Sequence, residues 1–158
     1  MITVKTFVFN PFQVNTYLVW DESKHCTIID PACSTLEEFE TLKNYIASQQ
    51  LTPSGIIVTH GHVDHLLGLE RICSWYRLQP VVHRDELDFI QTAPQQAMLF
   101  SLPYEPYTGQ WNLVGENDTV MLGKTEAIVL TISGHSPAGM AVYCPTDNCI
   151  FTGYALFI

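Results

Sequence analysis

The chain has 158 residues, of which 47% are hydrophobic, and its formal net charge of −9 comes from 16 acidic and 7 basic residues. This size and composition predict one globular domain over residues 1–158. The Lys and Arg residues are scattered singly, which excludes the clustered cations of a nucleic-acid binder. No hydrophobic run reaches the roughly 18 residues of a membrane span and no signal peptide is recognisable, so we expect a cytoplasmic protein without a membrane partner.

The N-terminal residues are predicted to form three strands. Alternating, β-branched and aromatic residues favour strands over 2–9 and 14–20, with a turn at Asn10-Pro11 that makes the two strands antiparallel. A third strand is predicted over 26–30. Asp30 is therefore expected where a strand ends beside the start of a helix.

The following residues alternate between helix and strand patterns. A capping box at Ser34-Thr35-Leu36-Glu37 opens a helix that is predicted to run to about Ser48 with one buried face. A strand over 55–59 and a helix over 66–78 come next. Strands that alternate with helices in this way are typical of a layered α/β domain.

The loop between that strand and that helix carries an H-x-H-x-D-H run made of His60, His62, Asp64 and His65. Neutral imidazoles and carboxylates are ligands for Zn²⁺, Fe²⁺ or Mn²⁺, and a strand-to-helix loop lets alternate side chains converge on one point. The run therefore predicts a metal-binding loop. The alternative is a polar loop whose histidines cap the following helix or lie in water.

The middle of the chain gives weaker signals. A strand is predicted over 80–83 and a short helix over 84–91, and His83 at the strand end is interpreted as a surface or hydrogen-bonded residue more readily than as a ligand. Residues 92–116 are rich in Pro and aromatic residues and show neither helical nor strand period. Such a segment is either a functional lid or a loop that covers one side of the core.

The last third is predicted to be β structure, with strands over 118–122, 127–132, 139–143 and 149–152. His135 lies on a Gly/Pro loop between two of these strands. A catalytic zinc site commonly has three protein ligands and a water, so His135 is a candidate third ligand beside His60 and His62. Asp64 and His65 either support a second metal or act as the base that orients an attacking water.

The five cysteines are odd in number and include no C-x₂-C pair. They are interpreted as reduced core residues, so neither a disulfide framework nor a structural zinc knuckle is expected.

Together these motifs resemble the metallo-β-lactamase superfamily, and within it the glyoxalase II-like (hydroxyacylglutathione hydrolase-like) hydrolases. The matching stretches follow the order of the family and cover nearly the whole chain: Asn15-Thr16-Tyr17-Leu18-Val19, Ile28-Ile29-Asp30-Pro31, Thr59 to His65, Gly134 to Gly139, and Ile150-Phe151-Thr152-Gly153. The resemblance implies an α/β (α+β) fold, the αββα sandwich, with the last part of its second half missing.

The resemblance also implies the function and the site. It indicates a metal-dependent hydrolase that cleaves an ester or thioester with metal-activated water. His60, His62 and His135 would hold the first metal, and Asp64 and His65 the second. Zinc is the expected metal, with iron or manganese as alternatives. Asp64 is the predicted catalytic residue.

The chain departs from the family pattern at two points. Tyr154 stands where the family has an aspartate that bridges both metals, and a neutral phenol is a poor ligand. The family chain also continues to one more histidine, whereas this sequence stops at Ile158. We therefore expect fewer than two well-bound metals per chain. The alternative function is a truncated or degenerate non-catalytic relative that folds by association with another chain.

The sequence ends on the hydrophobic stretch Ala155 to Ile158, although chain ends are usually polar. This ending predicts a domain that is incomplete at its C-terminus and a homo-oligomer formed through hydrophobic surface.

Overall fold

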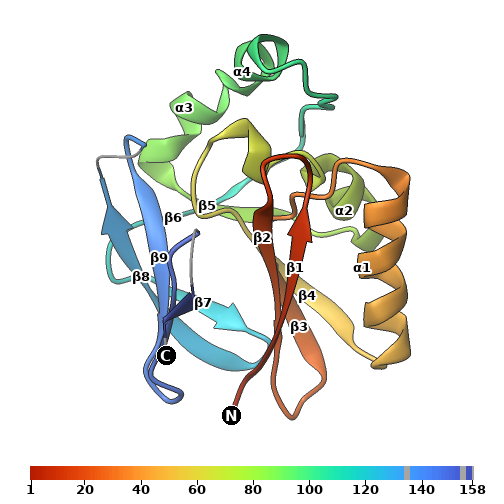
Figure 1. Cartoon of the computed structure of the whole chain (residues 1–158). Helices are drawn as coiled ribbons and strands as arrows, with labels where there is room; N and C mark the ends of the chain where they lie inside the picture. Colours follow the sequence, from red (N-terminus) through yellow and green to blue (C-terminus); the bar gives the residue numbers. More distant parts are fainter. Residues whose placement is uncertain (134–135, 154–155, 158) are drawn as a thin grey trace.

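The computed structural model describes residues 1–133, 136–153 and 156–157 (Figure 1). His135 and Tyr154, on which two predictions depend, lie outside these residues. The elements of the first half are β1 (Thr3–Phe9), β2 (Val14–Trp20), β3 (His25–Ile29), α1 (Leu36–Ser48), β4 (Thr52–Ile57), the 3₁₀ turn η1 (Val63–His65) and α2 (Leu69–Tyr76). Those of the second half are β5 (Pro80–His83), the 3₁₀ turn η2 (Arg84–Glu86), α3 (Leu87–Ile90), α4 (Ala93–Leu99), β6 (Asn112–Val114), β7 (Thr119–Leu122), β8 (Thr125–Ile132), β9 (Gly139–Cys144), β10 (Cys149–Phe151) and β11 (Leu156–Phe157).

The strands form two sheets that face each other. The six-stranded sheet has the order β1-β2-β3-β4-β5-β6 and the five-stranded sheet the order β11-β10-β9-β8-β7. The pairs β1·β2 and β2·β3 are antiparallel, whereas β3·β4, β4·β5 and β5·β6 are parallel, as the βαβ connections through α1 and α2 require. The expected α/β sandwich class is thereby confirmed.

Alternate residues of the six-stranded sheet fill two separate cores. On β2, Leu18 and Trp20 pack against the helices α1 and α2, while Tyr17 and Val19 face the five-stranded sheet. The strand is buried on both faces because one face carries a helix layer and the other a sheet. Figure 1 shows α1 and α2 on the side of the six-stranded sheet away from the second sheet, and no described helix over the outer face of the second sheet.

The cysteine prediction agrees with the structure: all five cysteines are free and buried. Burial raises the pKa of the Cys26, Cys33 and Cys73 thiols to about 12. Within the described residues, no helix is long and hydrophobic enough to span a membrane.

The prediction of an irregular segment over 92–116 is wrong at both ends, where α4 and β6 form. Only Ala93 and Ala97 of α4 are buried, and Met98 and Leu99 point to solvent, so the helix has almost no hydrophobic period to detect. β6 has three residues and lies at a sheet edge, which is too short for an alternation signal.

Two predicted helix starts are also displaced. Thr35, not Ser34, is the N-cap of α1, since its side chain accepts a hydrogen bond from the amide of Glu38. The helix predicted from Leu66 begins at Leu69, because the metal loop first makes the 3₁₀ turn η1 and Gly68 becomes the N-cap.

Candidate metal centre

The H-x-H-x-D-H loop lies at the edge of the sandwich, between the ends of β4 and β9. The amide of Asp30, at the end of β3, donates to the carbonyl of Ile57 on β4 over 2.8 Å, so both strands end at the same level. The carbonyl of Thr59 accepts a hydrogen bond from the amide of Met140 over 2.8 Å. The loop is therefore attached to both sheets.

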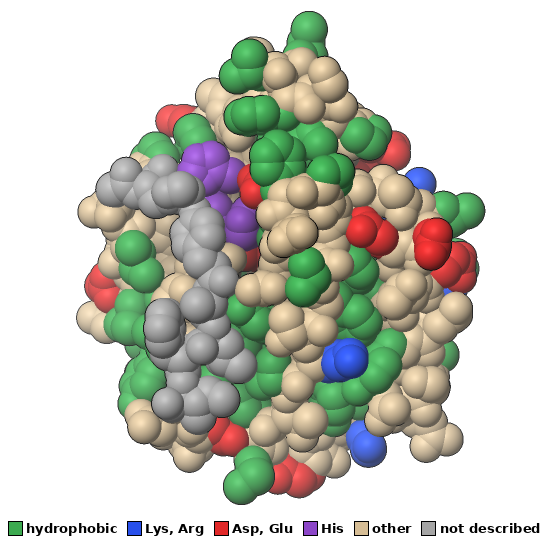
Figure 2. Space-filling model, in the orientation of Figure 1, with side chains coloured by type: hydrophobic (Ala, Val, Ile, Leu, Met, Phe, Trp, Pro, Cys, Tyr) green, Lys and Arg blue, Asp and Glu red, His purple; other side chains and the backbone are tan. Residues whose placement is uncertain are grey.

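Four of the predicted ligand side chains lie near one another here. The ring centroids of His60 and His65 lie 4.0 Å apart and those of His60 and His62 lie 5.0 Å apart. Nε2 of His65 is 3.8 Å from Oδ2 of Asp64. His60 and His65 are each 3% exposed, so they are held away from bulk water. Figure 2 shows histidine side chains at the surface next to hydrophobic and acidic side chains, with Lys and Arg side chains farther away on that face.

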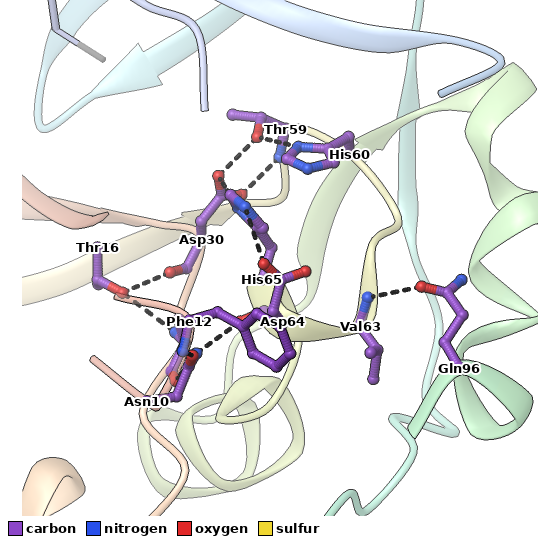
Figure 3. Close-up of polar contacts among 11 residues, drawn as sticks. Asn10, Phe12, Thr16, Asp30, Thr59, His60, Val63, Asp64, His65 and Gln96 are labelled. Carbon is purple, nitrogen blue, oxygen red and sulfur yellow. Dashed lines mark hydrogen bonds and ion pairs between the residues drawn. The ribbon is translucent and has the colours of Figure 1, made fainter. Parts of the chain in front are cut away.

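Asp30 contacts residues at both ends of the loop, Thr59 and His65 (Figure 3). Its carboxylate accepts hydrogen bonds from the amide of Thr59 over 2.7 Å, from Oγ1 of Thr59 over 2.6 Å and from Nδ1 of His65 over 3.0 Å. The side chain is fully buried, and the backbone carbonyl of Asp30 accepts from Oγ1 of Thr16 over 2.6 Å. These bonds use the carboxylate oxygens and fix the position of Thr59, immediately before the motif, and of His65, its last residue.

The same hydrogen bonds favour one tautomer in the rings of His60 and His65, with the proton on Nδ1. Oγ1 of Thr59 donates its single proton to Asp30, so it can only accept from Nδ1 of His60, 3.0 Å away. Nδ1 of His65 likewise donates to Asp30. When the two rings are neutral, Nε2 then keeps its lone pair, which is the state in which a histidine binds a metal.

Burial and two nearby carboxylates have opposite effects on the pKa of His65. Burial on its own would lower the pKa of His65, but the hydrogen bond from His65 to Asp30 and the charges of Asp30 and Asp64 outweigh it and raise the pKa. The two carboxylates beside the ring therefore stabilise a positive charge at this position.

The donor set suits a metal ion. One ligand atom from each of Asp30, His60 and His65 lies within 4.8 Å of the others. Imidazole and carboxylate donors are suited to zinc and iron. Since Asp30 already accepts three hydrogen bonds, we interpret it as the residue that orients the histidines, and His60, His62, Asp64 and His65 as the ligand candidates. His135, the fifth predicted ligand, lies outside the described residues.

His83, the weaker candidate of the sequence, is not part of this cluster. Its Nδ1 accepts from the amide of Asp85 over 3.1 Å, and its Nε2 lies 3.0 Å from Oγ1 of Thr131 on β8. The ring is buried and hydrogen-bonded, which agrees with the structural interpretation of this residue rather than with a ligand role.

A pocket of about 210 Å³ opens beside the histidines. Its lining is mostly hydrophobic, and its residues come from the β1–β2 turn, the metal loop and the segment around α4: Phe12, His60, His62, Val63, Asp64, Gln96, Phe100 and Leu102. Oε1 of Gln96 accepts from the amide of Val63 over 3.1 Å, and Nδ2 of Asn10 donates to the carbonyl of Asp64 over 2.9 Å. The walls of the pocket are thus fastened to the metal loop (Figure 3).

Sequence reasoning did not assign three residues of the site. For Asp30 and Thr59 the sequence offered an indication of a role in the site, since each is the last residue of a predicted strand at the edge where the metal loop begins. For Glu86 the sequence offered none, because this residue lies in the short polar stretch Arg84-Asp85-Glu86, yet it is fully buried and accepts from the amides of Gly61 and Ala138.

Comparison with known proteins places this geometry in context. A family model described as the metallo-beta-lactamase superfamily matches residues 9–158. The chain is 25% identical over 149 residues to the probable metallo-hydrolase YqgX of Bacillus subtilis, with 93% of this chain and 68% of that protein covered. It is 27% identical to the hydroxyacylglutathione hydrolase GloC of Haemophilus influenzae, with 92% of this chain and 68% of that protein covered.

A third relative is the hydroxyacylglutathione hydrolase of Prochlorococcus marinus, which is 26% identical over 92% of this chain and 50% of that protein. The chain thus spans between 50% and 68% of the length of these three relatives. Among solved structures, TTHA1623 in a di-iron-bound form has a TM-score of 0.82 and 26% identity, with 94% of this chain and 71% of that chain covered. The BLEG-1 B3 metallo-beta-lactamase has a TM-score of 0.81 and 22% identity over 95% of this chain and 71% of that one, which supports the fold.

Proposed function

Because the chain belongs to the metallo-beta-lactamase superfamily, we propose that it is a metal-dependent, glyoxalase II-like hydrolase that cleaves an ester or thioester. The family resemblance of the sequence is confirmed at the level of the superfamily. Two of the relatives named above are hydroxyacylglutathione hydrolases at 26–27% identity, which supports the choice of reaction.

The observation that carries the proposal is the proximity of the His60, His62 and His65 rings, with Asp64 beside His65, next to a hydrophobic pocket. The hydrogen bonds that orient His60 and His65 support the use of these rings as metal ligands.

His60, His62 and His135 would hold the first metal, and Asp64 and His65 would contribute to a second one. A bound Zn²⁺ or Fe²⁺ would supply a Lewis acid that polarises the substrate carbonyl and lowers the pKa of water toward about 7. The donor set suits either metal, and the di-iron form of TTHA1623 supports iron as an alternative to zinc. We expect fewer than two well-bound metals per chain, since Tyr154 replaces the bridging aspartate of the family.

Asp64 is the proposed general base. Its side chain lines the pocket and is 26% exposed, and the bond from Asn10 to its carbonyl holds its backbone. From this position a carboxylate oxygen can accept the proton of a water that attacks the scissile carbonyl.

The pocket indicates where the substrate lies. Phe12, Val63, Phe100 and Leu102 present hydrophobic surface beside the ligand candidates, and no Lys or Arg of the described residues lines the pocket. A hydrophobic acyl portion of the substrate would therefore bury against these side chains, while its carbonyl faces His60 and Asp64.

The proposal is tested by replacing one ligand candidate and one matched histidine far from the site. His62→Ala should abolish both bound metal, measured by elemental analysis, and thioester hydrolysis. His25→Ala at the start of β3 should leave both within about twofold of wild type. Folded wild-type protein that binds metal but hydrolyses no ester or thioester would favour the alternative, a non-catalytic relative.

The homo-oligomer and the cytoplasmic location stay predictions. Hydrophobic side chains are exposed near the pocket, namely Phe12, Met98, Leu99 and Phe100, and such a surface would support association. A monomer by light scattering at micromolar concentration would contradict oligomerisation.

A further inference from the structure

Glu86 ends the 3₁₀ turn η2 after β5, and its carboxylate is fully buried. Oε2 accepts a hydrogen bond from the amide of Gly61 over 2.7 Å, and Oε1 accepts from the amide of Ala138 over 2.8 Å. Across residues 1–133, 136–153 and 156–157, no Lys, Arg or His forms an ion pair with Glu86. Burying a carboxylate without a cation has a desolvation cost that hydrogen bonds must offset. The bonds from these two amides therefore stabilise Glu86 in its buried position.

The two amides belong to the two segments that carry the predicted ligands. Gly61 lies between His60 and His62 in the metal loop of the first sheet. Ala138 lies three residues after His135 in the sequence and immediately before β9 of the second sheet. One side chain therefore joins the metal loop to the strand-end loop across the edge of the sandwich.

The segment that carries Glu86 is itself fixed to both sides. A Cβ atom on Gly61 would lie 2.7 Å from Cγ1 of Ile90 and 3.2 Å from its amide nitrogen, so α3 packs directly against the metal loop. On the other side, His83 contacts Thr131 of β8 over 3.0 Å. The turn η2 and helix α3 are thus held in place by contacts with the metal loop and, through His83, with β8 of the second sheet.

We propose that Glu86 is a positioning residue of the metal site, which holds the metal loop and the loop before β9 at the separation that metal binding requires. It touches neither substrate nor metal. The chemistry of the side chain is specific, because both partners are N–H donors and only a carboxylate offers two acceptor oxygens. Gln in its place would turn an NH₂ group toward one of the two amides.

This inference rests on the metal site of the proposed function, and its test uses Zn²⁺ and Co²⁺ as probes of the metal-free protein. Glu86→Gln should weaken Zn²⁺ binding by about 10- to 100-fold, the range typical of residues that orient metal ligands. It should also alter the visible absorption of bound Co²⁺, which reports the geometry of the ligands.

Asp21→Asn is the matched control. Asp21 is also a buried carboxylate that joins both sheets, but at the opposite end of the sandwich, where it accepts from the amide of Lys124 over 2.9 Å and from Oγ1 of Thr125 over 2.8 Å. Its replacement should reduce resistance to urea and leave Zn²⁺ affinity within about twofold. If Glu86→Gln behaves in the same way, with lower stability and unchanged Zn²⁺ affinity, the positioning role is wrong.

The wild-type protein supplies a test that needs no folded variant. The amides of Gly61 and Ala138 should exchange with deuterium slowly and at similar rates in the metal-free protein, because one carboxylate holds both. Fast exchange of either amide in the folded, metal-free chain would overturn the inference. Failure of wild type to bind Zn²⁺ at all would instead contradict the proposed function, and slow exchange would still agree with the two Glu86 contacts.

Discussion

Nδ1 of His65 lies 3.0 Å from Oδ2 of Asp30, and 35 residues separate the two in the sequence. The contact joins the end of β3 to the turn η1 and directs Nε2 of His65 toward Asp64. The same carboxylate holds Thr59, which in turn holds His60. The buried side chain of Asp30 thus sets the orientation of two histidines. A substitution at Asp30 should therefore affect metal binding through both rings.

Asp30→Asn should weaken metal binding by about 10- to 100-fold and lower the free energy of unfolding by about 1–3 kcal/mol. The amide keeps one acceptor oxygen but turns a donor toward either Thr59 or His65. Asp30 has a positive φ of 54°, a conformation that Asn also tolerates, so the substitution changes hydrogen bonding without adding backbone strain. Isothermal titration with Zn²⁺ and urea unfolding measure the two effects. Unchanged Zn²⁺ affinity would contradict the orienting role.

Asp21 should make stability depend on acid pH. Burial on its own would raise the pKa of this carboxyl, but hydrogen bonds from Ser23, Thr125 and the Lys124 amide outweigh it and bring the pKa below the usual 3.8. Since the folded pKa is lower than the unfolded one, the stabilisation is present above about pH 3.8 and is lost as the pH falls through the folded pKa. Urea unfolding between pH 2.5 and 7 should therefore show a steeper acid loss in wild type than in Asp21→Asn. Parallel curves would refute this assignment.

Phe100→Ser should lower kcat/KM for a thioester with a long acyl chain by about three- to tenfold and leave an acetyl thioester unaffected. Phe100 lines the pocket and packs edge-on against Phe12, with ring centroids 5.5 Å apart. Leu99→Ser is the control, since Leu99 is the neighbouring residue, is 78% exposed and is absent from the pocket lining. Equal losses in both variants, or equal losses for both substrates, would show that the pocket does not receive the acyl chain.

Tyr154→Asp should raise the amount of metal bound per chain. The expectation follows from the resemblance to the family, in which an aspartate at this position bridges two metals, since Tyr154 itself lies outside the described residues. A carboxylate can coordinate at neutral pH, whereas a phenol must first lose its proton. Elemental analysis of dialysed protein measures the ratio. An unchanged ratio would mean that this position does not limit occupancy.

The features that the sequence predicts well are local. The H-x-H-x-D-H run places four ligand candidates within six residues, so a loop at a strand end is enough to keep these side chains near one another. The strand pattern of β2 and the hydrophobic spacing of α1 are also local periodicities, and both elements form, α1 with its N-cap one residue later than predicted.

The features that the sequence does not predict depend on distant partners. Glu86 is 25 residues from Gly61 and 52 from Ala138, and nothing in its neighbourhood distinguishes it from a solvated acidic residue. Helix α4 is missed for a different reason: only two of its residues, both alanines, are buried, so its sequence shows no hydrophobic spacing typical of a helix. Its Gln96 contacts the distant metal loop, where Oε1 accepts from the amide of Val63.

The bond between the carbonyl of Thr59 and the amide of Met140, with the bonds of Glu86, makes the shape of the site depend on residues far apart in the sequence. Closing such contacts has an entropic cost that slows folding. The four ligand candidates of the H-x-H-x-D-H run lie within six residues, so an unfolded chain also offers them to metal. Zn²⁺ held by an unfolded chain reduces the stabilisation that binding gives to the native state. Refolding should accordingly give a higher yield when Zn²⁺ is added after the two sheets have joined than when it is present from the start.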